Sequence, residues 1–117
     1  MNPVTEQELQ SASVAPRITP ADIEANIDLE FYFTAADGVY SATGVVAEEM
    51  PKFGPPLSRL TFCVLVLRNG YTVTGESACA SPENFNADIG RRIARENAVN
   101  KIWPLMGYEL KNRLSNG

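Results

Sequence analysis

The sequence predicts a small single domain of the α+β class, and three observations carry that prediction. The chain has 117 residues, of which 44% are hydrophobic, so it has room for one modest core. An apolar run, a turn signal and a second run of strand-forming residues predict a β-hairpin over residues 60–77. A long segment with helical periodicity follows and predicts a C-terminal helix that is kinked at Pro104.

The segment 1–17 is polar and contains few large apolar side chains. This composition predicts a flexible tail that becomes ordered only against a partner, followed by one domain over residues 18–117. The tail has neither the basic start nor the apolar run of a signal peptide. No stretch approaches the roughly 18 apolar residues that a membrane span needs, so we expect a soluble cytoplasmic protein without a membrane partner.

An N-terminal helix is predicted to begin at Pro20. Thr19 suits the N-cap, Pro20 suits the first helical position, and Asp22 places a carboxylate near the amino end of the helix. Ile18 can pack onto Ile23 across this start as a hydrophobic staple. These signals all indicate the same helix start.

The far end of this helix is open to two interpretations. Apolar residues recur at helical spacing at Ile23, Ile27 and Phe31, which predicts a helix to about residue 31 or 33. The segment 31–34, Phe-Tyr-Phe-Thr, is equally typical of a strand. Closely spaced Gly and Pro residues then predict a loop-rich insert at about 36–58, with a short edge strand over residues 38–46.

The hairpin turn is predicted to be Asn69-Gly70, a strong signal for type I′, because both central residues of that turn need positive φ. A two-residue loop pairs Leu67 with Thr72, and alternate pairs then lie on opposite faces. One face carries Phe62, Val64, Val66, Tyr71 and Val73. The other carries Cys63, Leu65, Leu67, Thr72, Thr74 and Glu76. Since the first strand is apolar on both faces, either each face is covered or the strand lies inside a wider sheet.

The C-terminal helix has two candidate starts, Ser81-Pro82-Glu83 and a later one at Asn86 with Asp88. A short turn that leads into the main helix uses both. A stripe that faces the core is predicted on one side, formed by Phe85, Ile89, Ile93 and Trp103. Pro104 is expected to end or kink the helix, and the apolar residues beyond it are expected to continue as a short last helix.

Composition narrows the chemistry. Histidine is absent, which removes the commonest general base, the usual zinc ligand and the serine-type triads. Neither a phosphate loop nor a dinucleotide-binding fingerprint occurs, and we expect no cofactor and no metal. Cys63 and Cys79 form no Cys-x-x-Cys pair, so two reduced, partly buried thiols are expected. The net charge of −4 argues against broad binding to a phosphate backbone.

Three groups of polar residues are candidates for binding a ligand or partner. The first lies where the second strand meets the helix, where helix amides favour an anion, and consists of Glu76, Ser77, Cys79 and Ser81. The second is a basic strip on the helix, formed by Arg91, Arg92 and Arg95. The third lies close to the core-facing stripe and consists of Glu96, Asn97 and Asn100.

Each group has a competing structural interpretation. The first serves equally as a tight connection whose small residues let the helix pack on the sheet. The basic strip is also explained by a solvated helix face that carries ion pairs. The third group is explained by a buried polar network or by a dimer contact. The structural interpretation is favoured for the first and third groups.

Several segments from Leu60 onward resemble a known family. They are Thr61-Phe62-Cys63-Val64-Leu65, Asn69-Gly70-Tyr71-Thr72-Val73-Thr74-Gly75-Glu76-Ser77-Ala78-Cys79, Phe85-Asn86, Ile89-Gly90-Arg91-Arg92-Ile93-Ala94, and Ile102-Trp103-Pro104-Leu105 with Gly107-Tyr108. These segments are similar to the small tailed-phage proteins grouped by the gene forty-nine and gene sixty-six products of two enterobacterial phages. The resemblance implies a phage or prophage origin. No activity is attached to that family, so the resemblance implies no catalytic residues.

The sequence therefore predicts a non-enzymatic phage accessory protein that acts in the host cytoplasm by binding. A role against host defence is expected, with a host protein or a small anionic ligand such as a nucleotide signal as the partner. We also expect a homo-oligomer, in which two hairpins pair edge to edge. The alternatives are a nucleic-acid-associated protein that uses the strip of three arginines, and an enzyme that uses Cys79 or Ser77 with Glu76.

Overall fold

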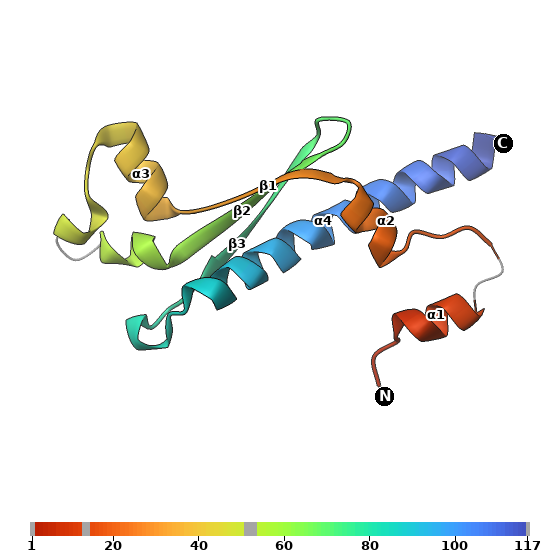
Figure 1. Cartoon of the computed structure of the whole chain (residues 1–117), viewed down its shortest axis with the longest axis horizontal. Coiled ribbons are helices and arrows are strands. Elements are labelled where there is room, and N and C mark those ends of the chain that lie inside the picture. Colours follow the sequence, from red (N-terminus) through yellow and green to blue (C-terminus); the bar gives the residue numbers. More distant parts are fainter. Residues whose placement is uncertain (1, 13–14, 51–53, 117) are drawn as a thin grey trace.

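A three-stranded antiparallel sheet and one long helix form the two main layers of the molecule (Figure 1). The computed structural model describes residues 2–12, 15–50 and 54–116. The strands β1 (Ile27–Thr34), β2 (Leu60–Leu67) and β3 (Thr72–Ala78) lie in that order across the sheet, and α4 (Ala87–Asn116) runs along one face of it. The predicted α+β class is confirmed.

Part of the predicted tail forms a short helix, α1 (Glu6–Ala12), which lies beside α2 and apart from the sheet (Figure 1). None of its residues is buried. One ion pair joins it to the following segment, with Arg17 Nη2 at 2.5 Å from Glu6 Oε1. The flexibility of this tail stays a prediction.

The helix α2 (Pro20–Ala25) begins as predicted. Thr19 and Asp22 form a reciprocal capping box, in which each backbone N–H donates to the other's side chain, at 2.8 and 3.2 Å. The helix ends at Ala25, so the prediction of a helix to residue 31 or 33 is wrong and the strand interpretation is right. The aromatic and β-branched residues at 31–34 pair with β2, and the helical spacing of the earlier apolar residues is overridden by that pairing.

The predicted edge strand over residues 38–46 is also wrong, because α3 (Ala35–Thr43) occupies most of that segment. Thr34 and Asp37 form a second capping box with the same Thr-x-x-Asp spacing as the first. Gly44 ends the helix with a φ of 74°, which a residue with a side chain rarely adopts. The insert also contains two 3₁₀ helices, Ala47–Glu49 and Pro55–Arg59, so it is less loop-rich than expected.

The hairpin forms, but its predicted two-residue turn is wrong. The loop has three residues, 68–70: Leu67 N–H donates to the Tyr71 carbonyl at 2.8 Å, and Gly70 alone of the described hairpin glycines has positive φ, at 89°. The register therefore shifts by one residue, so that Leu65 faces Val73. Such a shift moves every side chain of one strand to the other face. Val73 joins the buried face, whereas Thr72, Thr74 and Glu76 move to the open one.

Both predicted helix starts are used, as a 3₁₀ turn over Pro82–Asn84 and then as α4, where Asn86 Oδ1 accepts from Ile89 N–H at 3.0 Å. The predicted core stripe is wrong. Ile89 and Ile93 are 47% and 43% exposed and Trp103 is 36% exposed, whereas Gly90, Ala94, Ala98 and Ile102 face the sheet and are buried. Pro104 lies inside the helix, which continues to Asn116, so the expected end at this proline is excluded.

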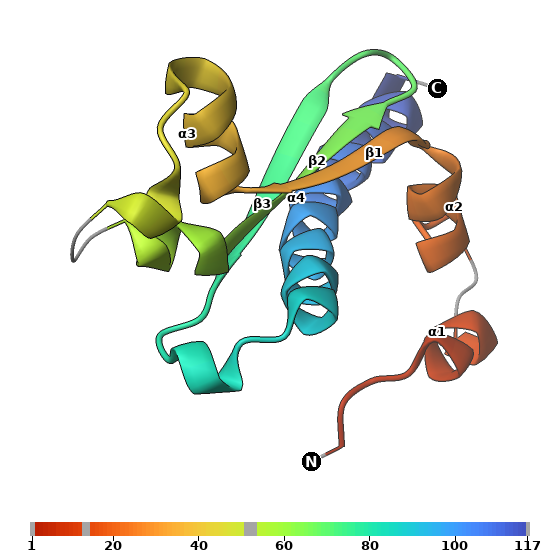
Figure 2. The ribbon, with the colours of Figure 1, turned by 60° about the vertical axis from the view of Figure 1, so that its left-hand side comes forward.

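The core lies between α4 and the sheet. Its buried members are Ile23, Cys63, Leu65, Leu67, Val73, Ala94, Ala98 and Ile102. β2 is the central strand of a wider sheet, as its apolar character predicted, and α4 covers only one of its faces. Figure 2 shows α3 and α4 on opposite sides of the sheet, with α3 at one end. Among the described residues, the opposite face is left open over most of its length.

Candidate functional site

A cleft of about 140 Å³ lies where the end of β1, the start of α3 and the start of α4 meet. Its lining is aromatic on two sides and carries one cation. The lining residues are Tyr32, Phe33, Thr34, Asp37, Thr61, Phe85, Ala87 and Arg91. The capping box at Thr34 turns the chain sharply from strand to helix and so forms one wall of the cleft.

Arg91 is the side chain that gives this cleft its chemistry. It is exposed and makes no hydrogen bond or ion pair with any residue that the structure describes. The other charge in the cleft, on Asp37, is engaged locally, because its carboxylate accepts from the Thr34 N–H at 2.9 Å. The cleft therefore presents one unpaired guanidinium beside aromatic rings, which suits an anionic group attached to a flat apolar one.

Arg95, one turn further along α4, has a different role. Its Nη2 lies 2.7 Å from Glu24 Oε2 and its Nε lies 2.9 Å from Glu30 Oε1, so it joins α4 to α2 and to β1. The Tyr32 hydroxyl donates to the other oxygen of Glu30 at 2.7 Å. Arg95 therefore links three elements, α4, α2 and β1.

The pKa values of this network follow from burial and hydrogen bonding. Hydrogen bonds from Arg95 lower the pKa of Glu24. Burial acts to raise the pKa of Glu30, but hydrogen bonds from Tyr32 and Arg95 outweigh it and the pKa is lowered. Burial, followed by the hydrogen bond to Glu30, raises the pKa of Tyr32. Burial also raises the pKa of the Cys63 thiol, which is fully buried.

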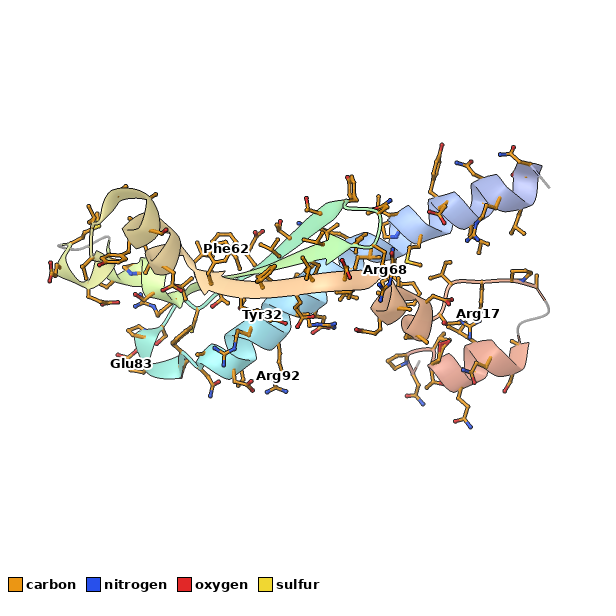
Figure 3. The ribbon with its side chains drawn as sticks, turned by 45° about the horizontal axis from the view of Figure 1, so that its top comes forward. Arg17, Tyr32, Phe62, Arg68, Glu83 and Arg92 are labelled. Carbon is orange, nitrogen blue, oxygen red and sulfur yellow. The ribbon has the colours of Figure 1, made fainter. Side chains whose placement is uncertain are left out.

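Arg92 points away from the sheet (Figure 3) and forms an exposed ion pair with Asp88, with Nε at 3.2 Å from Oδ2. The three arginines of the predicted strip therefore have three different surroundings: a cleft, an interhelical network and solvent. The structure does not bring them together into one contiguous basic surface.

The predicted group at the strand-to-helix connection is also divided. Glu76 pairs with Phe62 and lies on the open face of the sheet, whereas Ser77 lies on the helix side and with Cys79 lines a second cleft of about 150 Å³. The Cys79 thiol donates to the Ser81 carbonyl at 3.1 Å, and the Ser81 hydroxyl donates to Glu83 at 2.7 Å. Both cysteines are free.

Of the third group, only Asn97 has a partner among the described residues: its Nδ2 donates to the Glu76 carbonyl at 2.9 Å. Glu96 and Asn100 are exposed. The described residues contain no cluster of three side chains able to hold a metal ion. Within the same residues, no helix has the length and apolar character that crossing a membrane requires.

Sequence reasoning missed the aromatic walls of the Arg91 cleft. Tyr32 and Phe33 lie in the segment 31–34, which the sequence allows to be helix or strand. Phe85 belongs to the predicted core stripe. The Thr-x-x-Asp spacing at residues 34–37 indicates a helix start next to Phe33. The same spacing at residues 19–22 marks the start of α2.

The fold and the cleft define a small α+β protein in which one long helix packs on a three-stranded sheet. At a partly aromatic cleft it carries Arg91, which is unpaired among the described residues. The chain belongs to the phage protein (N4 Gp49/phage Sf6 gene 66) family, whose model matches residues 18–114. The resemblance stated from the sequence is thereby confirmed. A comparison with curated proteins and a comparison with solved structures each give no match.

Proposed function

We propose that this phage protein is a non-enzymatic accessory protein that acts in the host cytoplasm by binding a small anionic ligand, such as a nucleotide signal, and thereby opposes a host defence. The observation that carries the proposal is Arg91, the one arginine of the expected strip that is left unpaired among the described residues and that lines a cleft. The aromatic rings beside it add a surface on which a planar group can stack.

The size of the cleft sets what it can hold. Its volume of about 140 Å³ is smaller than the roughly 300–1,000 Å³ of pockets that enclose a whole ligand. It therefore fits one group of a ligand, with the remainder lying outside. An anionic group at Arg91 with an attached ring on Phe33 or Phe85 matches the lining.

The proposal is tested by thermal stabilisation of the purified protein with a panel of nucleoside phosphates and cyclic dinucleotides, and with inorganic phosphate for the anion alone. A ligand at 100 times its Kd stabilises the folded state by about 2.7 kcal/mol, which raises Tm by roughly 5 °C or more in a protein of this size. We expect Arg91→Gln to abolish the shift.

Arg92→Gln is the matched control, because it removes the same charge from the adjacent position, where the side chain faces solvent. It should retain the shift within about 1 °C. If no probe stabilises the protein, or if both variants lose the shift equally, the cleft is not the binding site. Host-protein inhibition is the other form of the binding proposal, and capture of one host protein by the wild type but not by Arg91→Gln would support it instead.

A further inference from the structure

One face of the sheet is uncovered in the part of the chain that the structure describes. The side chains of β1 and β2 that point away from α4 are all large and apolar: Leu29, Phe31, Phe33, Leu60, Phe62, Val64 and Val66. Those from β1 are 48%, 54% and 40% exposed, in chain order. The same face of β3 is polar, with Thr72, Thr74 and Glu76. Water thus contacts a row of side chains that normally belong to a core.

The position of the helices leaves this face accessible. α4 packs on the opposite face, and Figures 1 and 2 both show α3 rising only at the end where β1 stops. Gly38 of α3 lies beside the ring of Phe33, and that ring stacks on Phe62 with centroids 5.5 Å apart. The β1 and β2 part of this face is therefore an apolar surface with a helix at one end.

We propose that a second copy of this chain covers this face, so that two sheets pack against each other with an α4 helix on each outer side. Facing sheets pack about 10 Å apart through interdigitated side chains, and a two-fold interface uses the same patch on both copies. The face suits its own copy because Glu76, at the rim, is the only ionisable one among the side chains named above. Neither like-charge repulsion nor an unpaired buried charge opposes the contact.

The apolar side chains of this face leave a continuous area open to water. An aromatic side chain presents roughly 200 Å², so Phe31 and Phe33 together leave about 190 Å² open. Leu29 and the partly buried Phe62, Val64 and Val66 extend this open apolar surface, and a second copy would remove it from water on both chains.

The structure disfavours the edge-to-edge pairing expected from the sequence. β3 is the free edge of the hairpin, since β1 pairs with the other strand. Asn97 donates to the Glu76 carbonyl on this edge and so occupies an acceptor that a partner strand would need. The face of the sheet has no such obstruction.

The test is molar mass by light scattering over a range of protein concentrations, for the wild type, Phe31→Glu and Ile89→Glu. Ile89 is the matched control: it is exposed to a similar extent but lies on α4, away from the open face of the sheet. We expect a dimer for the wild type and for Ile89→Glu, with Kd values within threefold of each other. Phe31→Glu should raise Kd at least 100-fold while circular dichroism stays unchanged.

A strictly monomeric wild type at all concentrations would overturn the proposal. So would a dimer that Ile89→Glu dissociates and Phe31→Glu does not, because that result places the interface on the helix side or at the β3 edge. If Phe31→Glu fails to fold, the interface is tested by placing the photo-cross-linker benzoylphenylalanine at position 31. Unlabelled and heavy-isotope-labelled copies are mixed before irradiation, so that cross-links between copies can be told from those within one copy. Cross-links between copies that fall in β1 or β2 support the sheet face, and their absence refutes it.

This inference is independent of the ligand at Arg91, and the two can fail separately. Mass responds to Phe31, whereas thermal stabilisation by an anion responds to Arg91. A dimer without any anion binding would leave the interface established and the proposed function wrong.

Discussion

Gly75 sets the distance between the long helix and the sheet. A Cβ atom at this position would lie 2.1 Å from the Ala94 carbonyl oxygen and 2.3 Å from the Ala98 nitrogen. Both are backbone atoms, so neither can rotate away, and the helix would have to move outward. Gly75 is therefore required for the closeness of α4 to β3, and the small side chains of Ala94 and Ala98 serve the same purpose.

We accordingly expect Gly75→Ala to destabilise the protein by more than about 2 kcal/mol, because the added methyl group overpacks a backbone contact. Gly107→Ala is the control: Gly107 lies in α4 with nothing within 4 Å of the new methyl group, and the change should stabilise the protein by about 0.5–1 kcal/mol. Urea denaturation measures both. Equal stability of the two variants would show that α4 lies further from β3 than described.

The helix α4 contains a proline, Pro104, in its interior. Pro104 has no N–H, so the carbonyl one turn earlier, on Asn100, loses its helical donor. The 30-residue helix nevertheless continues, and Met106 and Leu110 beyond the proline are partly buried. The packing of this last stretch outweighs the cost of the proline.

Pro104→Ala should therefore stabilise the protein by about 1–3 kcal/mol, since it restores a backbone hydrogen bond and removes a clash with the preceding turn. Lys101→Ala, an exposed change to an equally good helix former, should stay within about 0.5 kcal/mol. Thermal and chemical unfolding give the comparison. Destabilisation by Pro104→Ala would mean that a bend at the proline is needed to seat the end of the helix.

The whole molecule is held together partly by Arg95, which connects α4 to α2 and β1 through Glu24 and Glu30. The pKa values of both carboxyls are lowered in the folded protein, from an ordinary value of 4.5. Stability from this network is therefore fully present above pH 4.5 and is lost as the pH falls through the lowered folded-state pKa values. The carboxyls are partly exposed, so solvent screening limits the network to about 1 kcal/mol.

The free energy of unfolding should therefore depend on pH more steeply in the wild type than in a variant without Arg95. The wild type should lose about 1 kcal/mol more stability between pH 6 and pH 3 than Arg95→Met does, since the variant keeps an unbranched apolar stem but loses the charged guanidinium. Arg92→Met, which breaks only an exposed pair with Asp88, should follow the wild-type curve. Parallel curves for wild type and Arg95→Met would show that the network contributes nothing to stability.

Local signals in the sequence were sufficient for the starts of helices and for the existence of the hairpin. The capping box at Thr19 and the cap at Asn86 act over three residues, so they can be read without the rest of the chain. Thr34 carries the same signal, although the glycines after it favoured a different interpretation. The candidate site was harder to predict, because Tyr32, Phe85 and Arg91 come from three separate elements.

The sequence by itself determined the class of fold and the resemblance to a phage protein family, which the family match confirms. Because it contains no histidine, it also excluded catalysis and zinc binding by histidine side chains. The tertiary structure alone decided which side of the hairpin is buried and which face of α4 packs on it. The physical reason is that a one-residue difference in loop length reverses the faces of a strand. A helix that approaches a sheet to backbone contact must also turn its smallest residues, Gly90, Ala94 and Ala98, toward it at the point of contact. Ile89, Ile93 and Trp103 are left exposed.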